Sequence, residues 1–203
     1  MTDTRQASSS VLVEERGAYA IVRLANPARR NALSHATLDL LDQAASALIA
    51  RPDLQAIIFT GADDVFASGA DIRELQRLTP ATAREFAARG QRLFHRIADA
   101  PQTTIAAING YCMGGGLDLA LACKLRYAAA NAIFAHPGAS LGIITGWGGT
   151  QRLPRLVGTA RALEMFLTAR LVTSDEALAW GLVNRICDPV LQCACEAARS
   201  GSV

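Results

Sequence analysis

The sequence predicts an α/β fold with a parallel sheet core. Two continuous apolar runs, Ala56–Thr60 and residues 104–108, are typical of strands that are buried on both faces. Stretches with helical apolar periodicity alternate with the strand-like segments, and this alternation favours parallel pairing. With 203 residues and 51% apolar content, the chain can bury one sizeable core. We therefore expect a single domain.

The first elements are a hairpin and a helix. Residues 11–15 and 20–24 read as two strands that turn at Gly17. Ser34 is expected to cap a helix. The apolar stripe of that helix consists of Leu38, Leu41, Ala45 and Leu48. The buried run Ala56–Thr60 follows and ends at Gly61.

The later elements repeat this pattern. A helix is predicted to begin at Thr79-Pro80, where proline is tolerated in the first turn, and to end near Asp99. Residues 125–130 and 133–135 read as strands. Thr173 and Glu176 form a capping box that opens a helix ending at Gly181, before a strand at 183–186. A short helix is expected at 190–199.

Composition excludes several classes of partner. The net charge of +2 is too small to indicate a nucleic-acid or membrane-surface partner. Residues 1–10 are polar and serine-rich without an apolar core, so we expect a flexible N-terminus and a cytoplasmic protein. Asn109, Asp118 and several glycines interrupt the apolar segment 104–123, which argues against a membrane span. The five cysteines contain no C-x-x-C pair, which favours free thiols over a disulfide or metal role.

Two glycine-bearing segments carry the functional signal. They read Phe-Ala-Ser-Gly-Ala-Asp-Ile from Phe66, and Asn-Gly-Tyr-Cys-Met-Gly-Gly-Gly-Leu-Asp from Asn109. Each follows a strand-like run and leaves backbone N–H groups unobstructed by side chains. Two such donors converging from separate loops form an oxyanion hole, which stabilises negative charge on a carbonyl oxygen. The alternative is that the glycines only permit tight turns.

These segments resemble the crotonase family, also called the enoyl-CoA hydratase/isomerase superfamily. The resemblance runs from about Asn26 to Ile186. Besides the glycine segments it includes Asn26-Pro27 with Arg30-Asn31-Ala32-Leu33, Gly146-Trp147-Gly148-Gly149-Thr150-Gln151-Arg152-Leu153-Pro154, and Ala179-Trp180-Gly181-Leu182-Val183. It implies a crotonase/ClpP-like spiral of ββα units over residues 11–187, followed by a truncated C-terminal helical remnant at 188–203.

The resemblance also implies roles for individual residues. The N–H groups of Ser68 and Gly115 would hold a thioester oxygen, and the start of the helix after Gly115 would favour that charge. The backbones of Ala70, Asp71 and Ile72 would contact coenzyme A. Asp71 alone reads as a helix cap, in a capping box with Glu74.

Further family positions concern the binding of the coenzyme A phosphates and the transfer of a proton. Arg29 and Arg30 lie where the family approaches the coenzyme A phosphates, and a solvated loop pair is the alternative. Family hydratases carry two glutamates at positions that hold Asp118 and Gly138 here. One carboxylate is therefore shortened and the other is absent, and a capping role for Asp118 stays open.

Other side chains near Gly138 are candidates to replace the missing glutamate. His136 titrates near neutral pH and is a candidate base, against a structural role. Ser140 and Thr145 show no spacing that would activate them as nucleophiles. Ser34-His35 reads as a helix cap and its neighbour rather than a dyad.

The resulting hypothesis is an acyl-CoA enzyme of the hydratase/isomerase group, most simply a hydratase of 2-enoyl-CoA. Coenzyme A would be part of the substrate, and neither a metal nor another cofactor is expected. The alternatives are acyl-CoA decarboxylation, isomerisation or thioester hydrolysis in the same fold, and a non-catalytic acyl-CoA binder. The family suggests a homo-oligomer, a trimer or hexamer, unless the short C-terminus alters it.

Overall fold

The computed structural model describes residues 9–200. Residues 1–8 of the predicted flexible N-terminus lie outside the described residues. The larger sheet has six strands in the order β1-β2-β3-β5-β7-β10. Only β1 and β2 pair antiparallel, and the other neighbours pair parallel. Its strands are β1 (Val11–Arg16), β2 (Tyr19–Leu24), β3 (Ala56–Thr60), β5 (Thr103–Ile108), β7 (Leu125–Ala128) and β10 (Arg185–Ile186). The predicted parallel core is confirmed.

A smaller sheet has four strands in the order β4-β6-β8-β9. These are β4 (Val65–Ala67), β6 (Tyr111–Met113), β8 (Ile133–Ala135) and β9 (Val172–Thr173). Consecutive strands along the chain alternate between the sheets: β3, β5 and β7 enter the larger one, and β4, β6 and β8 the smaller one. A helix follows each such pair, which gives the expected spiral of ββα units. The glycine segments lie where β4 and β6 end.

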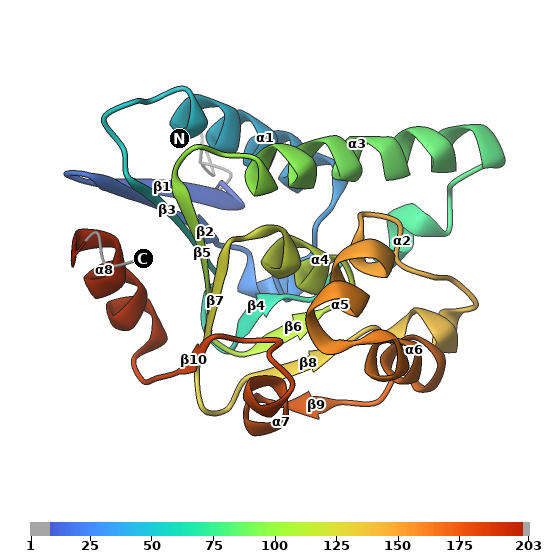
Figure 1. Ribbon diagram of the computed structural model, residues 1–203. Coiled ribbons are helices and arrows are strands. Elements are labelled where there is room, and N and C mark those ends of the chain that lie inside the picture. Colours follow the sequence, from blue (N-terminus) through green and yellow to red (C-terminus); the bar gives the residue numbers. More distant parts are fainter. Residues whose placement is uncertain (1–8, 201–203) are drawn as a thin grey trace, which may run out of the picture.

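Helices cover both faces of the larger sheet (Figure 1). They are α1 (His35–Ile49), α2 (Ile72–Leu75), α3 (Pro80–Ala98), α4 (Gly115–Ala122), α5 (Gly149–Val157), α6 (Thr159–Thr168), α7 (Ser174–Ala179) and α8 (Val190–Ser200). Short 3-10 turns, η1 (Pro27–Arg29) and η2 (Pro137–Leu141), complete the set. Within residues 9–200, none of the helices has the length and hydrophobicity that crossing a membrane requires.

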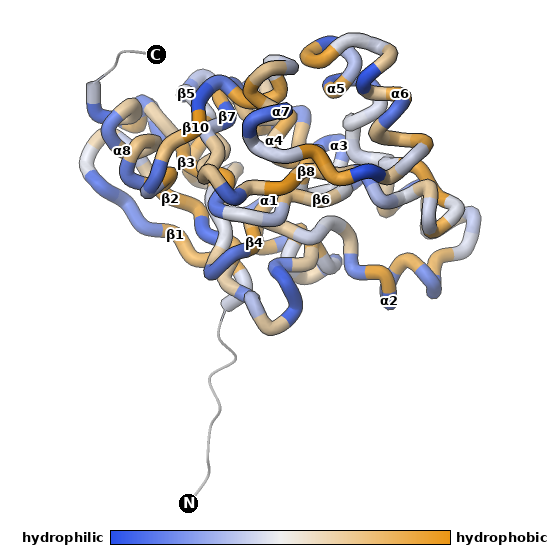
Figure 2. Tube along the Cα trace, turned by 90° about the horizontal axis from the view of Figure 1, so that it is seen from below, coloured by the Kyte–Doolittle hydropathy of each residue, from blue (hydrophilic) through white to orange (hydrophobic). Residues whose placement is uncertain are grey.

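The core consists of two clusters, one on each side of the larger sheet. The main cluster includes buried residues of α1, α3 and α4 and of both sheets, and α4 is buried along its whole length. The second cluster forms where Val190, Ala194, Cys195 and Ala198 of α8 pack against the opposite face of the sheet. Figure 2 shows one of several hydrophilic stretches beside β1, whose residues Glu14, Glu15 and Arg16 are exposed.

Most local predictions are confirmed. Ser34 caps α1, Thr79 caps α3 and Thr173 forms the predicted box with Glu176 at α7. All five cysteines are free thiols. The predicted strand at 183–186 is wrong in extent, because pairing with β7 involves only Arg185 and Ile186.

Candidate active site

The loop after β4 brings one amide to the site. The Ser68 N–H donates a hydrogen bond to the Arg30 carbonyl at 3.1 Å, so the prediction of Ser68 as an oxyanion donor is wrong. The reason is a backbone pairing with residues 30–33, in which the Leu33 N–H also donates to the Gly69 carbonyl at 2.8 Å. Gly69 takes a positive φ of 96° and turns the chain. The next amide, Ala70 N–H, has no acceptor among residues 9–200.

The loop after β6 brings the second amide. Gly114 adopts a positive φ of 50°, and its N–H donates to the Ala135 carbonyl at 2.9 Å. Gly115 is the first residue of α4, so its N–H lacks an acceptor within the helix. A β-carbon on Gly115 would lie 3.5 Å from the Ala70 nitrogen. The Ala70 and Gly115 amides therefore lie close together, as an oxyanion hole requires.

Both amides border one cavity of about 370 Å³. Apolar side chains of α2, of α3 and of the segment between them, among them Leu75, Phe86 and Leu78, form much of its wall. The loop from Pro137 to Trp147 forms another part of the wall. The polar side chains of the wall are Ser68, His136 and Thr145. A mostly apolar cavity with a few convergent polar groups is typical of a small-molecule site.

Asp118 lies behind this wall and is fully buried in α4. Its Oδ2 accepts hydrogen bonds from the Thr145 hydroxyl and from the Trp147 N–H, the latter at 3.3 Å. The Gly149 backbone at the start of α5 also approaches the carboxylate, so that a β-carbon on Gly149 would collide with Asp118 Oδ1. Burial raises the pKa of Asp118 to about 6, and the contacts with Thr145, Trp147 and Gly149 oppose that rise. Near neutral pH the carboxylate is mainly ionised.

His136 connects Asp118 to the cavity. It is 2% exposed, and its Nε2 lies 3.7 Å from Asp118 Oδ1. The Phe166 ring packs against the imidazole at a centroid distance of 4.8 Å. Burial lowers the pKa of His136 to about 4, so the ring is neutral near neutral pH. Sequence reasoning considered His136 only as a substitute base, because its distance to Asp118 depends on how β8 pairs with β6.

Gly138 has no room for a side chain. A β-carbon there would lie 2.6 Å from the Ile143 carbonyl oxygen, because residues 138–143 form a tight turn with a hydrogen bond from the Ile143 N–H to the Gly138 carbonyl. The carboxylate that the family carries at this position is therefore excluded by the local backbone. His136 and Thr145 are left as the polar side chains on this side of the cavity.

The predicted coenzyme A contacts lie around Ala70. Asp71 caps α2 by accepting from the Arg73 N–H at 2.9 Å, and the Arg29 guanidinium lies 3.4 Å from its carboxylate. Ile72 lines the cavity and is half-exposed. The Arg30 guanidinium lies over the Tyr111 ring, 5.0 Å from its centroid.

The predicted capping box between Asp71 and Glu74 is wrong. The Glu74 carboxylate instead accepts from the backbone N–H of His35 at 2.7 Å and contacts the His35 ring at 2.6 Å. Glu74 thereby satisfies an N–H at the start of α1, which lies beside α2 in space but far from it in sequence.

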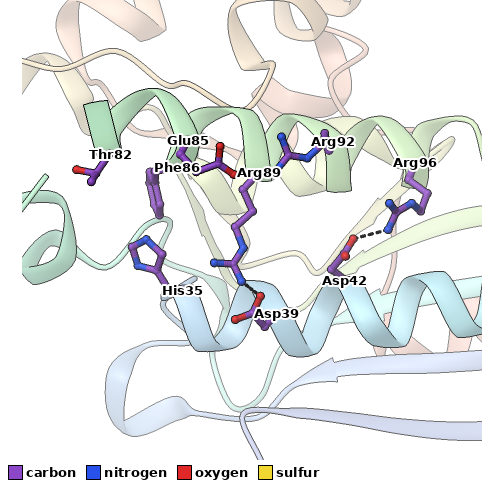
Figure 3. Close-up of a pocket in the computed structure, with 9 residues that line it drawn as sticks. All are labelled: His35, Asp39, Asp42, Thr82, Glu85, Phe86, Arg89, Arg92 and Arg96. Atoms are coloured by element: carbon purple, nitrogen blue, oxygen red, sulfur yellow. Dashed lines mark hydrogen bonds and ion pairs between the residues drawn. The ribbon is translucent and has the colours of Figure 1, made fainter. Parts of the chain in front are cut away.

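A second cavity of about 390 Å³ lies between α1 and α3 (Figure 3). Its charged side chains pair with one another: Arg89 with Asp39, Arg96 with Asp42 at 2.5 Å, and Arg92 with Glu85 at 3.0 Å. Because these charges compensate each other and the free amides lie elsewhere, we do not place the thioester in this cavity.

Comparison with known proteins agrees with this geometry. The family model described as "Enoyl-CoA hydratase/isomerase" matches residues 14–199. The "Crotonyl-CoA hydratase" of Syntrophomonas wolfei is 41% identical over 184 residues, which are 90% of this chain and 71% of the relative. The "Short-chain-enoyl-CoA hydratase" of Clostridium acetobutylicum is 38% identical over 182 residues, 89% of this chain and 70% of the relative.

Solved structures give the same result. An enoyl-CoA hydratase from Bacillus anthracis superposes with a TM-score of 0.89 at 33% identity, over 94% of this chain and 76% of that one. DspI from Pseudomonas aeruginosa gives a TM-score of 0.90 at 34% identity, over 98% of this chain and 77% of that one. Sequence, fold and site geometry thus agree, and the chain belongs to the enoyl-CoA hydratase/isomerase family.

Proposed function

We propose that this protein adds water to the double bond of a 2-enoyl-CoA thioester. The observation that carries the proposal is the pair of N–H groups of Ala70 and Gly115, which have no acceptor among the described residues and border the same apolar cavity. Relatives that are 38–41% identical are named as hydratases of crotonyl-CoA or short-chain enoyl-CoA.

The two amides would act on the thioester oxygen. As water attacks Cβ, the electrons of the double bond move onto that oxygen and create an enolate. Both N–H groups then bind a full negative charge, and the positive end of α4 adds to the attraction. A single donor of this kind typically contributes roughly 10²–10³-fold in kcat.

Coenzyme A would extend from the cavity along the loop after β4. The backbones of Ala70, Asp71 and Ile72 border this path, and Arg29 and Arg30 supply positive charge suited to phosphate oxygens. Coenzyme A is part of the substrate in this proposal, and the reaction requires no metal or redox cofactor.

Proton transfer would depend on Asp118. Its pKa of about 6 lies near the pH at which a general acid or base works best, and the Thr145 hydroxyl fixes the orientation of its carboxylate. The exclusion of a side chain at Gly138 favours a second candidate, thioester hydrolysis or decarboxylation, because these reactions use the oxyanion hole without a second carboxylate.

The test is turnover of crotonyl-CoA by the purified protein. Hydration predicts loss of enoyl absorbance without release of free thiol, and Asp118→Asn should lower kcat roughly 10²–10⁴-fold. Asp53→Asn is the matched control, because Asp53 is an exposed aspartate paired with Arg51. Thiol release would instead support hydrolysis, and binding of crotonyl-CoA without turnover would contradict an enzymatic role.

We further propose a homo-oligomer in the cytoplasm. The exposed leucines of α6 and the loop that follows it, Leu163, Leu167 and Leu171, support a contact between copies. The free thiols fit a reducing compartment. Light scattering of the purified protein measures the assembly, and a monomer at all concentrations would contradict this part of the proposal.

A further inference from the structure

Three buried polar atoms beside the cavity have no hydrogen-bond partner among residues 9–200. They are both ring nitrogens of His136 and Oδ1 of Asp118. Leaving such atoms unpaired in a buried position costs free energy, and most native buried polar groups are satisfied. Unpaired buried atoms that lie next to a substrate cavity therefore indicate a role that is completed when a ligand is present.

The order of the groups suggests that role. Thr145 and Trp147 hold Asp118 Oδ2 on one side, which leaves Oδ1 directed at the imidazole. His136 in turn lines the cavity, together with Gly115 and Gly138. A carboxylate, an imidazole and the cavity therefore follow one another in that order. In catalytic triads a carboxylate behind a histidine orients the ring and stabilises the imidazolium that forms.

We infer that His136 is the catalytic residue that exchanges a proton with the substrate, and that Asp118 is a positioning residue that acts through it. The inference rests on the proposed hydratase function and assigns the proton transfer of that same site.

The step balances with one exchangeable proton. A nitrogen of neutral His136 removes a proton from water as the water oxygen bonds to Cβ, and the double-bond electrons move onto the thioester oxygen. The products of this half are the enolate, held by the Ala70 and Gly115 amides, and an imidazolium beside the Asp118 carboxylate. The imidazolium then returns the proton to Cα, which yields the 3-hydroxyacyl thioester and neutral His136.

Burial and charge set the starting protonation states of the pair. Near neutral pH the imidazole is free to accept a proton, and the adjacent carboxylate is mainly ionised. The other titratable groups around the pair are Cys112 of β6, whose thiol pKa is raised by burial and by Asp118, and Arg152 of α5, which acts on Asp118. Among these groups, His136 is the one that lines the cavity.

His136→Gln is the first test, because glutamine keeps a hydrogen-bonding side chain but cannot carry the proton. We expect kcat for crotonyl-CoA to fall roughly 10²–10⁴-fold with little change in KM. The control is His95→Gln, which alters an exposed histidine 3.2 Å from Asp99 on α3 and should keep wild-type kcat. Unchanged kcat in His136→Gln would overturn the inference.

Asp118→Asn tests the positioning role. Wild-type kcat should rise with pH through an acidic limb near the pKa of Asp118, about 6, because the ionised carboxylate stabilises the imidazolium. In Asp118→Asn that limb should disappear and kcat should be low at every pH. The double variant with His136→Gln should be no slower than the slower single variant, since the two residues act as a unit. An unchanged limb or additive losses would overturn the inference.

A second reaction separates this inference from the proposed function. Butyryl-CoA has no double bond to hydrate, but exchange of its Cα protons in D₂O uses the same enolate and the same proton acceptor. Exchange by the wild type that is lost in His136→Gln supports the inference even if crotonyl-CoA is not hydrated. Exchange that survives in His136→Gln contradicts it. A wild type that neither hydrates nor exchanges overturns both proposals.

Discussion

Substitutions of Asp118 and His136 are expected to change the pH dependence of stability in opposite directions. Burial raises the pKa of Asp118 from 3.8 to about 6. The folded state therefore holds a proton that the unfolded state has released, and stability present below pH 3.8 is lost as pH rises to about 6. At 1.36 kcal/mol per pKa unit, this loss amounts to about 3 kcal/mol.

The contribution of His136 to stability has the opposite pH dependence. Burial lowers its pKa from 6.5 to about 4, so stability present above pH 6.5 is lost as pH falls to about 4. This contribution is also about 3 kcal/mol, so the two groups nearly cancel in the wild type. As pH rises from 4 to 6, the free energy of unfolding of Asp118→Asn should increase by about 3 kcal/mol relative to wild type. Over nearly the same interval, the free energy of unfolding of His136→Gln should decrease by about 3 kcal/mol relative to wild type.

Urea unfolding across this pH range, followed by the fluorescence of buried Trp147, measures both differences. His95→Gln and Asp99→Asn are matched controls in the exposed pair on α3, whose side chains are 74% and 67% exposed. If both Asp118→Asn and His136→Gln stay parallel to wild type, neither group is desolvated as the structure shows, and the reasoning is refuted.

Three further substitutions test the surroundings of the site. Gly115→Ala places a β-carbon 2.3 Å from a ring carbon of Trp147, so the amide must move, and kcat/KM for crotonyl-CoA should fall roughly 10²-fold; wild-type kcat/KM would contradict this. Gly138→Glu restores a family carboxylate but meets the Ile143 carbonyl, so urea unfolding should show a loss of about 1–3 kcal/mol and kcat should not rise; a stable, faster enzyme would show that the turn adapts. Thr145→Val removes the hydroxyl that donates to Asp118, so the pKa of the carboxyl should rise above about 6 and the acidic limb of the kcat profile should move to higher pH; an unmoved limb would show that this hydrogen bond does not tune Asp118.

The sequence predicted the elements with strong local signals. Ala56–Thr60 is apolar throughout and forms a central strand, and Thr173 with Glu176 forms a capping box within four residues. Both features depend on residues that are close along the chain. The alternation of strands and helices likewise predicted the parallel sheet.

The errors concern contacts between distant segments. Ser68 was predicted as a donor, but Arg30 takes its N–H through a pairing of two loops that are far apart in sequence. Glu74 was predicted to cap its own helix, but it binds His35 of α1. Local patterns do not report these contacts, and the same limit left the proximity of His136 to Asp118 outside the sequence prediction.

The most direct measurement is a crystal structure with an unreactive acyl-CoA bound. We expect the thioester oxygen within about 2.7–3.2 Å of both the Ala70 and the Gly115 nitrogens, with the acyl chain beside His136. A thioester oxygen bound elsewhere, for example against the ion-paired cavity between α1 and α3, would contradict the proposed site and the reaction that depends on it.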